Sequence, residues 1–421
     1  MKCGYGWTAA LAVTLAVAAA PAGAEEPGSN ARQLWSVASY YDDAPQSASV
    51  LPSQDLPSST SADSPVAAVQ VHDGCTGCDG ACGQPGCAGC GGDYCLWNVY
   101  LGGLYMTRDD GDHYWWSYDD TDESVQLLDT RDARMDWAGG FEARIGRYIG
   151  CGPTRIELGY WGLFPDQEEV NLFGGPLGGS LNGILNWDSL DYNNVNADTF
   201  VADAQVHRLR RDWEMHNVEI NLAGLAGYGV CRDGCGSPWT FNWLTGVRYF
   251  RFDDDLQFGS SVVDTVFTGA VEEIFYDVNV DNSLIGWQVG GQAIFQACDR
   301  LSLLGGAKVG IYGNRIDHDS RIGGAAGDAI VNNGPNIGEP YNFSGSKDEV
   351  SFLAELDLGG LYTLNDCWQI AFGYRVVAVT GIALAADQIP TDLRGVNDLP
   401  IIASDGSLVV HGGYAGVTYS F

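Results

Sequence analysis

The feature that most constrains this chain is a series of long segments in which apolar and polar residues alternate. In "WTFNWLTGVRYF", Trp239, Phe241 and Trp243 fall on one face, and Asn242 and Arg248 fall on the other. The segments "HNVEINLAGLAGYGV" and "EVSFLAELDLGGLYTL" repeat this pattern. Successive side chains of a strand point to opposite faces, so a period of two indicates β-strands with one apolar face.

The length of these segments separates a membrane protein from a soluble one. Strands of soluble sandwiches are usually about 5–6 residues long, whereas a tilted strand that crosses a bilayer needs about 9–11. Charged residues lie opposite the aliphatic face, as a polar lumen requires, and Trp and Tyr cluster near segment ends, where membrane interfaces lie. The sequence therefore predicts an all-β fold, a transmembrane antiparallel up-and-down β-barrel over residues 96–421.

The connections between the segments alternate in length. Short connections near residues 151, 233, 299 and 366 are predicted to be periplasmic turns. Long connections at 108–135, 165–212, 253–282, 314–346 and 379–406 are predicted to be external loops. The count is about 10 strands, and 12 if residues 252–282 hide a second pair instead of one tall hairpin. An even number of strands is required if both termini of the chain face the periplasm.

Three segments precede the predicted barrel. Residues 1–24 carry Lys2, an apolar run and the small residues Ala22-Gly23-Ala24, the pattern of a secretory signal peptide. Residues 25–74 are rich in Ser, Pro and Ala and predict a disordered linker. Residues 75–95, "CTGCDGACGQPGCAGCGGDYC", form a Cys-rich segment that we expect in the periplasm.

The cysteines that follow the predicted signal peptide all fall in this segment or in the short connections. The chain has 12 cysteines, and the eleven that follow the signal peptide are Cys75, Cys78, Cys82, Cys87, Cys90, Cys95, Cys151, Cys231, Cys235, Cys298 and Cys367. An oxidising compartment favours a disulfide-rich plug or collar at the periplasmic rim. Two alternatives stay open: a thiolate metal site, although the spacing is shorter than in zinc fingers, and unpaired or intermolecular thiols.

The C-terminus indicates the destination of the chain. It ends in "YAGVTYSF", with Val417, Tyr419 and Phe421 on alternate positions. This ending resembles the signal that the barrel-insertion machinery reads in bacterial outer-membrane proteins. We therefore expect the cell outer membrane as location, with outer-membrane lipid and the insertion machinery as partners.

Polar residues opposite the apolar face are the candidates for lining the lumen. They are Glu142, Arg144, Glu157, Asn221, Gln288, Gln292, Glu355 and Asp357.

The chain is strongly acidic, with 54 acidic and 21 basic residues and a formal net charge of −33. This charge excludes nucleic acid as a partner, since phosphate binding needs Lys and Arg. The run at 109–136 and the run Asp253-Asp254-Asp255 place carboxylates in the predicted external loops. Carboxylate oxygens suit Ca²⁺, but no segment fits an EF-hand, so a solvated acidic loop is the main interpretation and a Ca²⁺ site the alternative.

Little in the sequence indicates catalysis. Asp112-His113 and Asp317-His318-Asp319 pair a carboxylate with a histidine, as general-base chemistry requires. A chain this acidic produces such neighbours by chance, and it has no phosphate loop, GxSxG or HExxH. We predict that the protein is not an enzyme and has no confident metal site.

The segments "NSLIGWQVGGQAIF" and "LSLLGGAKVGIYGN", with the terminal Phe, resemble the β-barrel porin family of planctomycete bacteria over residues 96–421. The resemblance implies a porin-like passive channel in the outer membrane and supplies no catalytic residues. With acidic loops, its solutes are expected to be small and polar or cationic. The alternative is a structural outer-membrane anchor, cross-linked through its periplasmic cysteine face to cell-wall components or other chains.

Overall fold

The computed structural model describes residues 97–109, 113–120, 122–134, 137–149, 153–175, 180–228, 238–365, 367–390, 392–394 and 401–421. The predicted signal peptide, linker and Cys-rich segment lie outside the described residues.

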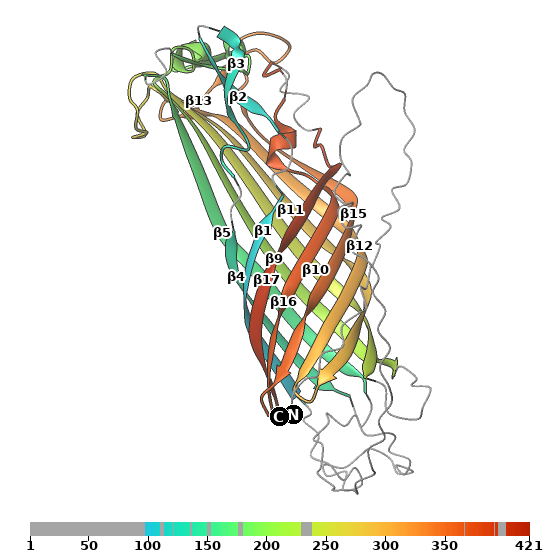
Figure 1. Cartoon of the computed structure of the whole chain (residues 1–421). Coiled ribbons are helices and arrows are strands. Elements are labelled where there is room, and N and C mark those ends of the chain that lie inside the picture. The colour runs from blue at the N-terminus through green and yellow to red at the C-terminus, as the bar shows by residue number, and fades with distance from the viewer. Residues whose placement is uncertain are drawn as a thin grey trace, which may run out of the picture. The chain divides into compact units, whose positions relative to one another are not determined.

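Ten long strands form the wall of a closed barrel (Figure 1). They are β1 (Trp97–Arg108), β4 (Ala138–Tyr148), β5 (Arg155–Phe173), β9 (Val206–Tyr228), β10 (Trp239–Ser261), β11 (Glu273–Cys298), β12 (Leu301–Gly324), β15 (Asn342–Thr363), β16 (Trp368–Ile382) and β17 (Gly406–Ser420). Each pairs antiparallel with the strand before and after it, and β1 pairs with β17 to close the ring. The predicted up-and-down barrel of ten strands is confirmed.

Smaller elements occupy the long connections at one end of the barrel (Figure 1). They are β2 (Trp115–Asp119), β3 (Asp122–Asp129), β6 (Leu181–Gly183), β7 (Leu190–Tyr192), β8 (Val195–Asn196), β13 (Gly327–Asp328), β14 (Ile330–Val331) and the 3₁₀ helices η2 (Trp187–Ser189), η3 (Ala197–Phe200) and η4 (Ala385–Gln388). We call these connections the head. None of the described helices is long and apolar enough to span a membrane.

The short connections lie at the other end, which we call the turn end. There the backbone N–H of Trp97 donates to the carbonyl of Phe421 (2.9 Å), so the first and last strands meet at this rim. The predicted external loops include residues that belong to the long strands. β10 runs to Ser261 and β11 begins at Glu273, so residues 252–282 form one tall hairpin, and the count of twelve strands is wrong.

The long strands extend beyond the apolar outer surface, and the polarity of their two faces reverses along their length. On β10 from Trp239 to Tyr249, the outward side chains are apolar or aromatic except for Thr245, and the inward ones include Arg248. From Arg251 onward, the outward side chains are charged or polar, and the inward Phe250, Phe252 and Phe258 are fully buried. The period of two continues through the reversal, so the strand continues too.

The apolar outer surface forms a belt around the barrel next to the turn end. Its most exposed members include Ile220, Ile285, Trp287, Val309, Phe352 and Leu358, each more than half exposed. Along β10 the belt covers Trp239–Tyr249, the length that a tilted strand needs to cross the hydrocarbon core. The membrane-spanning part of the barrel is therefore this belt, and the wall beyond it stands in water.

Two buried histidines lie in that water-exposed part. His207, at the head end of β9, contacts the Ser117 hydroxyl through Nδ1 (2.6 Å) and the Val201 carbonyl through Nε2 (3.2 Å). Burial lowers the pKa of His207 to about 4, and it lowers the pKa of His318 to about 4 as well. Both side chains are therefore neutral in the folded protein at neutral pH.

This neutrality predicts acid sensitivity. A lowered histidine pKa contributes stability that is complete above the unfolded value near 6.5 and is lost as pH falls toward 4. We expect wild-type stability to decrease by about 3 kcal/mol per histidine between pH 7.5 and pH 4, measured by urea unfolding in vesicles. The variant His207→Gln/His318→Gln should flatten this dependence. The control His411→Gln, on the outer wall, should leave it unchanged, and equal slopes in all three proteins would contradict the assignment.

Candidate functional site

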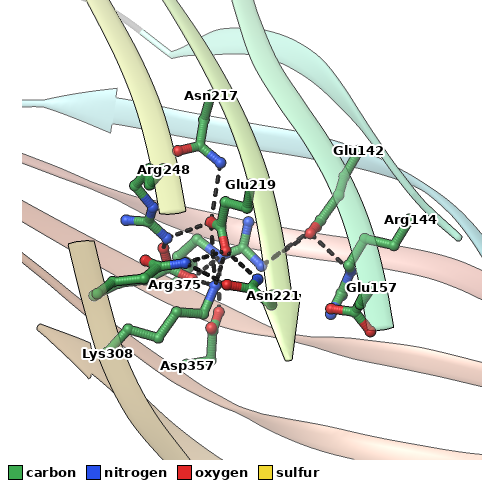
Figure 2. A network of polar contacts seen from close by, with 12 residues as sticks. Glu142, Arg144, Glu157, Asn217, Glu219, Asn221, Arg248, Lys308, Asp357 and Arg375 are labelled. Carbon is green, nitrogen blue, oxygen red and sulfur yellow. Dashed lines mark hydrogen bonds and ion pairs between the residues drawn. The ribbon is translucent and has the colours of Figure 1, made fainter. Parts of the chain in front are cut away.

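The candidate site is a network of charged side chains (Figure 2). It lies inside the barrel at the height of the belt. Inward residues alternate with belt residues along the same strands: Glu219 stands between Val218 and Ile220 on β9. The strand geometry that places the apolar belt outside thus places the polar residues inside.

The centre of the network is Arg248 on β10. Its Nη2 donates to Glu355 Oε2 on β15 (2.5 Å) and to Glu219 on β9. Lys308 on β12 bridges the same two carboxylates, with Nζ at 2.9 Å from Glu355 Oε1 and 3.2 Å from Glu219 Oε2. Four strands are thereby joined across the lumen by two cations and two carboxylates (Figure 2).

A second group continues the network toward β4. Arg375 on β16 donates through Nε to Asp357 Oδ1 (2.8 Å) and through Nη2 to Glu142 (3.3 Å). Arg144 Nε lies 3.0 Å from Glu142 Oε1, and Arg155 contacts Glu157 at 3.4 Å. The carboxylates and the basic groups of the network are equal in number, so the lumen at this height carries no net charge.

Amide side chains complete the arrangement. Gln288 Nε2 donates to Glu219 Oε2 (2.9 Å) and to Asn221 Oδ1 (2.8 Å). Asn217 and Asn221 donate to the two oxygens of Glu219 at 3.0 and 2.8 Å. The side chains of Arg248 and Glu355 are 0% exposed, so the other members of the network and the wall cover both of them completely.

An apolar layer lies above the network on the head side, and it is built by all ten long strands. Its strand members are Leu104, Met106, Ala138, Trp161, Leu163, Trp213, Met215, Phe250, Phe252, Leu284, Tyr312, Leu353, Val377, Val379, Ile382, Leu408, Val410 and Tyr414. Burial of large apolar side chains is the main stabilising term of such a layer. The interior therefore changes from a polar layer to an apolar one where the outer wall changes in the opposite sense.

The connection after β16 folds into the lumen above this layer. Gly381, with φ of 75°, turns the chain inward. Its carbonyl accepts from the Ser351 hydroxyl (2.6 Å), and Asn282 exchanges two hydrogen bonds with the backbone of Ala383 (2.8 and 2.9 Å). Asp254 accepts from the N–H of Ala385 (2.9 Å). Side chains on several strands thus hold this inserted segment by its backbone.

All eight predicted lumen residues face the interior. Glu142, Arg144, Glu157, Asn221, Gln288, Glu355 and Asp357 belong to the network, and Gln292 lies inward on β11, nearer the turn end. Their role in permeation stays a prediction. The candidate set missed six members of the network, although their position in the alternation marks them as inward: Arg155, Asn217, Glu219, Arg248, Lys308 and Arg375.

The cysteine prediction lies mostly outside the described residues. Cys298 ends β11 and Cys367 precedes β16, both half-buried at the turn end and not joined to each other. Cys75, Cys78, Cys82, Cys87, Cys90, Cys95, Cys151, Cys231 and Cys235 lie outside the described residues. The disulfide collar therefore stays a prediction.

The acidic run at 253–255 is in strand β10 and not in a loop. Asp254 points inward and pairs with Arg108 (2.8 Å), both side chains being buried, while Asp253 and Asp255 point outward. Within the described ranges, no group of three or more His, Cys, Asp or Glu side chains is arranged to hold a metal. The alternative of a Ca²⁺ site in the acidic loops stays untested, because Asp110 and Asp112 lie outside the described residues.

The structure describes both histidines of the two Asp/His motifs, and neither is seen paired with a neighbouring aspartate of its motif. His318 points into the barrel and packs edge-on against Phe343 (5.4 Å), whereas Asp317 and Asp319 are on the outer face. Because side chains alternate along the strand, His318 and the two aspartates lie on opposite faces of the wall. Asp112 lies outside the described residues, and His113 instead contacts Asp129 (2.9 Å).

Comparison with known proteins agrees with the resemblance. Residues 216–412 match the model of the family described as "Putative beta barrel porin-7 (BBP7)". That description names no bacterial group, so the planctomycete origin stays a prediction. No curated protein matches the chain.

Several solved outer-membrane proteins align with this chain at low identity and low TM-score. The protease OmpT from Escherichia coli aligns with a TM-score of 0.35 and 8% identity, over 77% of this chain and 97% of that one. A major outer membrane protein from Thermus thermophilus gives 0.28 and 10%, over 77% and 99%. The Pseudomonas putida toluene transporter TodX gives 0.24 and 12%, over 77% and 71%.

The closed ring and the apolar belt define a transmembrane β-barrel. With the family match, the chain is a porin-like β-barrel protein of the outer membrane.

The equal numbers of acidic and basic groups in the network predict how the stability of the protein responds to mutation. Glu355→Gln leaves Arg248, Lys308 and Arg375 with one carboxylate fewer, and breaking a buried pair costs about 3–5 kcal/mol. Glu355→Gln/Lys308→Met restores the balance, so we expect it to lose less stability than the sum of its single variants. Urea unfolding in vesicles measures this. The control Asp392→Asn, which breaks an exposed pair with Arg394, should cost at most about 1 kcal/mol, and additive losses would contradict the network.

Proposed function

We propose that this porin-like barrel is closed and acts as a structural anchor that holds the head above the membrane. The observation that carries the proposal is the complete burial of Arg248 and Glu355 in the centre of the lumen. A standing aqueous pore would leave lumen charges in contact with water, as in wide porins. A ring of ten strands encloses a narrow interior that side chains can fill.

The apolar layer supports closure independently of the network. Phe250, Phe252 and Met106 are fully buried at a height where the outer wall is already charged. An apolar constriction resists wetting, so it blocks ions even when its diameter would admit them. Solutes would have to cross this layer and the network in series.

The head supports the anchor role because it is packed onto the mouth of the barrel. Trp116 on β2 stacks on Phe258 of β10, with ring centroids 5.0 Å apart, and Trp187 of η2 lies 6.0 Å from the same ring. The interior of the wall and the head thus share one apolar core. A barrel that shares its core with the head suits a protein that presents a folded surface outside the membrane.

The turn end supplies the other half of the anchor. Cys367 lies at the rim where the Cys-rich segment joins the first strand in sequence. We propose that thiols of this rim tie the barrel to cell-wall components or to other chains. The separation of His318 from Asp317 and Asp319 supports a non-enzymatic role.

A passive channel for small polar or cationic solutes is the second candidate, favoured by the charged network at membrane height. Ionisable groups in a membrane span are costly and usually functional. Because the network is electrically balanced, any preference for cations would arise at the acidic outer surface.

Conductance in a planar bilayer separates the two candidates. The anchor proposal predicts no steady current through the wild-type protein at any salt concentration. An open porin reconstituted in the same bilayer serves as a control for the sensitivity of the measurement. Regular current steps from the wild-type protein would contradict closure and favour the channel.

Cross-linking at the turn end is tested separately. We expect non-reducing gels of the native membrane to show species above the monomer that disappear on reduction. Replacing Cys367 with Ser should reduce these species if this rim thiol takes part. Only monomer, with every thiol paired within the chain, would contradict the covalent tie.

A further inference from the structure

A pocket opens on the outer face of β9, β10 and β11, in the part of the wall that stands in water. Its volume is about 180 Å³, the space of about six water molecules at ~30 Å³ each. The residues that line it are Arg210, Asp212, Asp255, Leu256, Gln257, Asp277 and Asn279. One basic group and three carboxylates therefore share a space of the size of a small metabolite.

Arg210 lines this pocket without an ion-pair partner among the described residues. Strand register places Glu169 of β5 and Gln257 of β10 opposite it. Arg208 engages both of these neighbours: its Nη1 lies 3.9 Å from Glu169 Oε2, and its Nη2 donates to Gln257 Oε1 (2.8 Å). The guanidinium of Arg210 is thus left available to a ligand.

Asp255 faces the pocket from β10 and has no basic partner in the described part of the chain. Its neighbour on β9 is Asp212, which carries the same charge, and the side-chain amide of Asn279 on β11 lies 3.2 Å from its Oδ1. Partial burial, followed by the charges of Asp254 and Asp212, raises the pKa of Asp255 to about 7. A cation beside this carboxylate would relieve the repulsion.

Asp277 is the second carboxylate without a basic partner in the described ranges. It accepts a hydrogen bond from Gln257 Nε2 (2.6 Å). The basic residue opposite it on β12, Arg321, pairs with Asp328 instead (2.6 Å). Within the described chain the carboxylates do not converge as a metal site requires, so the pocket calls for an organic ligand that carries both signs of charge.

We propose that this pocket binds a basic α-amino acid, with the carboxylate at Arg210 and the ammonium groups at Asp255 and Asp277. Arg210 stands opposite Gln257, two residues beyond Asp255, and such diagonal neighbours lie about 7–8 Å apart. A group whose two charges are one carbon apart can bridge this gap with a charge-assisted hydrogen bond of about 2.7–2.9 Å at each end. The second ammonium matches the second carboxylate.

Simpler ions fit the pocket less well. An amine without a carboxylate would leave the guanidinium of Arg210 unpaired. An amino acid with an apolar side chain would bring one ammonium to two carboxylates. The site is separate from the anchor role, because it lies on the outer wall and closure depends on the lumen.

The test compares three probes of similar length. They are L-lysine, norleucine, which lacks the side-chain ammonium, and cadaverine, which lacks the carboxylate. The full chain is reconstituted in lipid nanodiscs, and each probe is titrated by saturation-transfer NMR. We expect saturable binding of lysine with an affinity about tenfold above that of either other probe, since each loses a charge-assisted contact. Lysine binding that does not saturate, or an equal affinity for norleucine or cadaverine, would overturn the proposal.

Variants of the wall provide the matched comparison. Arg210→Gln removes the group assigned to the carboxylate, so lysine should bind only as well as cadaverine. Asp255→Asn should weaken the binding of both. The control Arg315→Gln removes an exposed basic residue of the same wall that lies outside the pocket, and it should keep the wild-type affinities. Heat-shift electrophoresis verifies that each variant is folded, and wild-type lysine binding by folded Arg210→Gln would also overturn the proposal.

Discussion

Hydrogen bonding between β1 and β17 closes the sheet, and this closure gives every other feature of the molecule an inside and an outside. A closed ring has no free edge, which is what allows a sheet to stand in a bilayer. Once the ring is closed, the alternation of each strand assigns each residue to the lumen or to the outer wall. The belt, the network and the apolar layer all follow from that assignment.

The outer wall of the barrel contacts two environments, lipid next to the turn end and water nearer the head. Next to the turn end, apolar residues face lipid and the charges of Glu219, Arg248 and Glu355 face inward. Beyond Tyr249 the arrangement reverses, and Phe250 and Phe252 form part of an ordinary apolar core. The buried charges are costly to desolvate, so their mutual balance is required for the membrane part to be stable.

The sequence predicted the barrel, the number of strands and the inward position of Glu142 and Glu355, because alternation with a period of two reports the side of the wall directly. It did not predict that β10 continues through Asp253-Asp254-Asp255, since a run of acids reads as a solvated loop when only one polarity pattern is expected. The inward turn at Gly381 depends on distant partners such as Asn282 and Ser351. Contacts of this kind leave no local pattern.

Solvent accessibility along one strand tests the central claim, a closed lumen with a reversal of polarity at Tyr249. Nitroxide labels attached through an unnatural ketone side chain, which spares the native cysteines, would be placed along β10 in vesicles. The account predicts oxygen contact but no contact with a water-soluble nickel reagent at 241, 243, 247 and 249, nickel contact at 251, 253 and 257, and neither at 248, 250 and 252. Nickel contact at 248 and 250 would show an open lumen and contradict it.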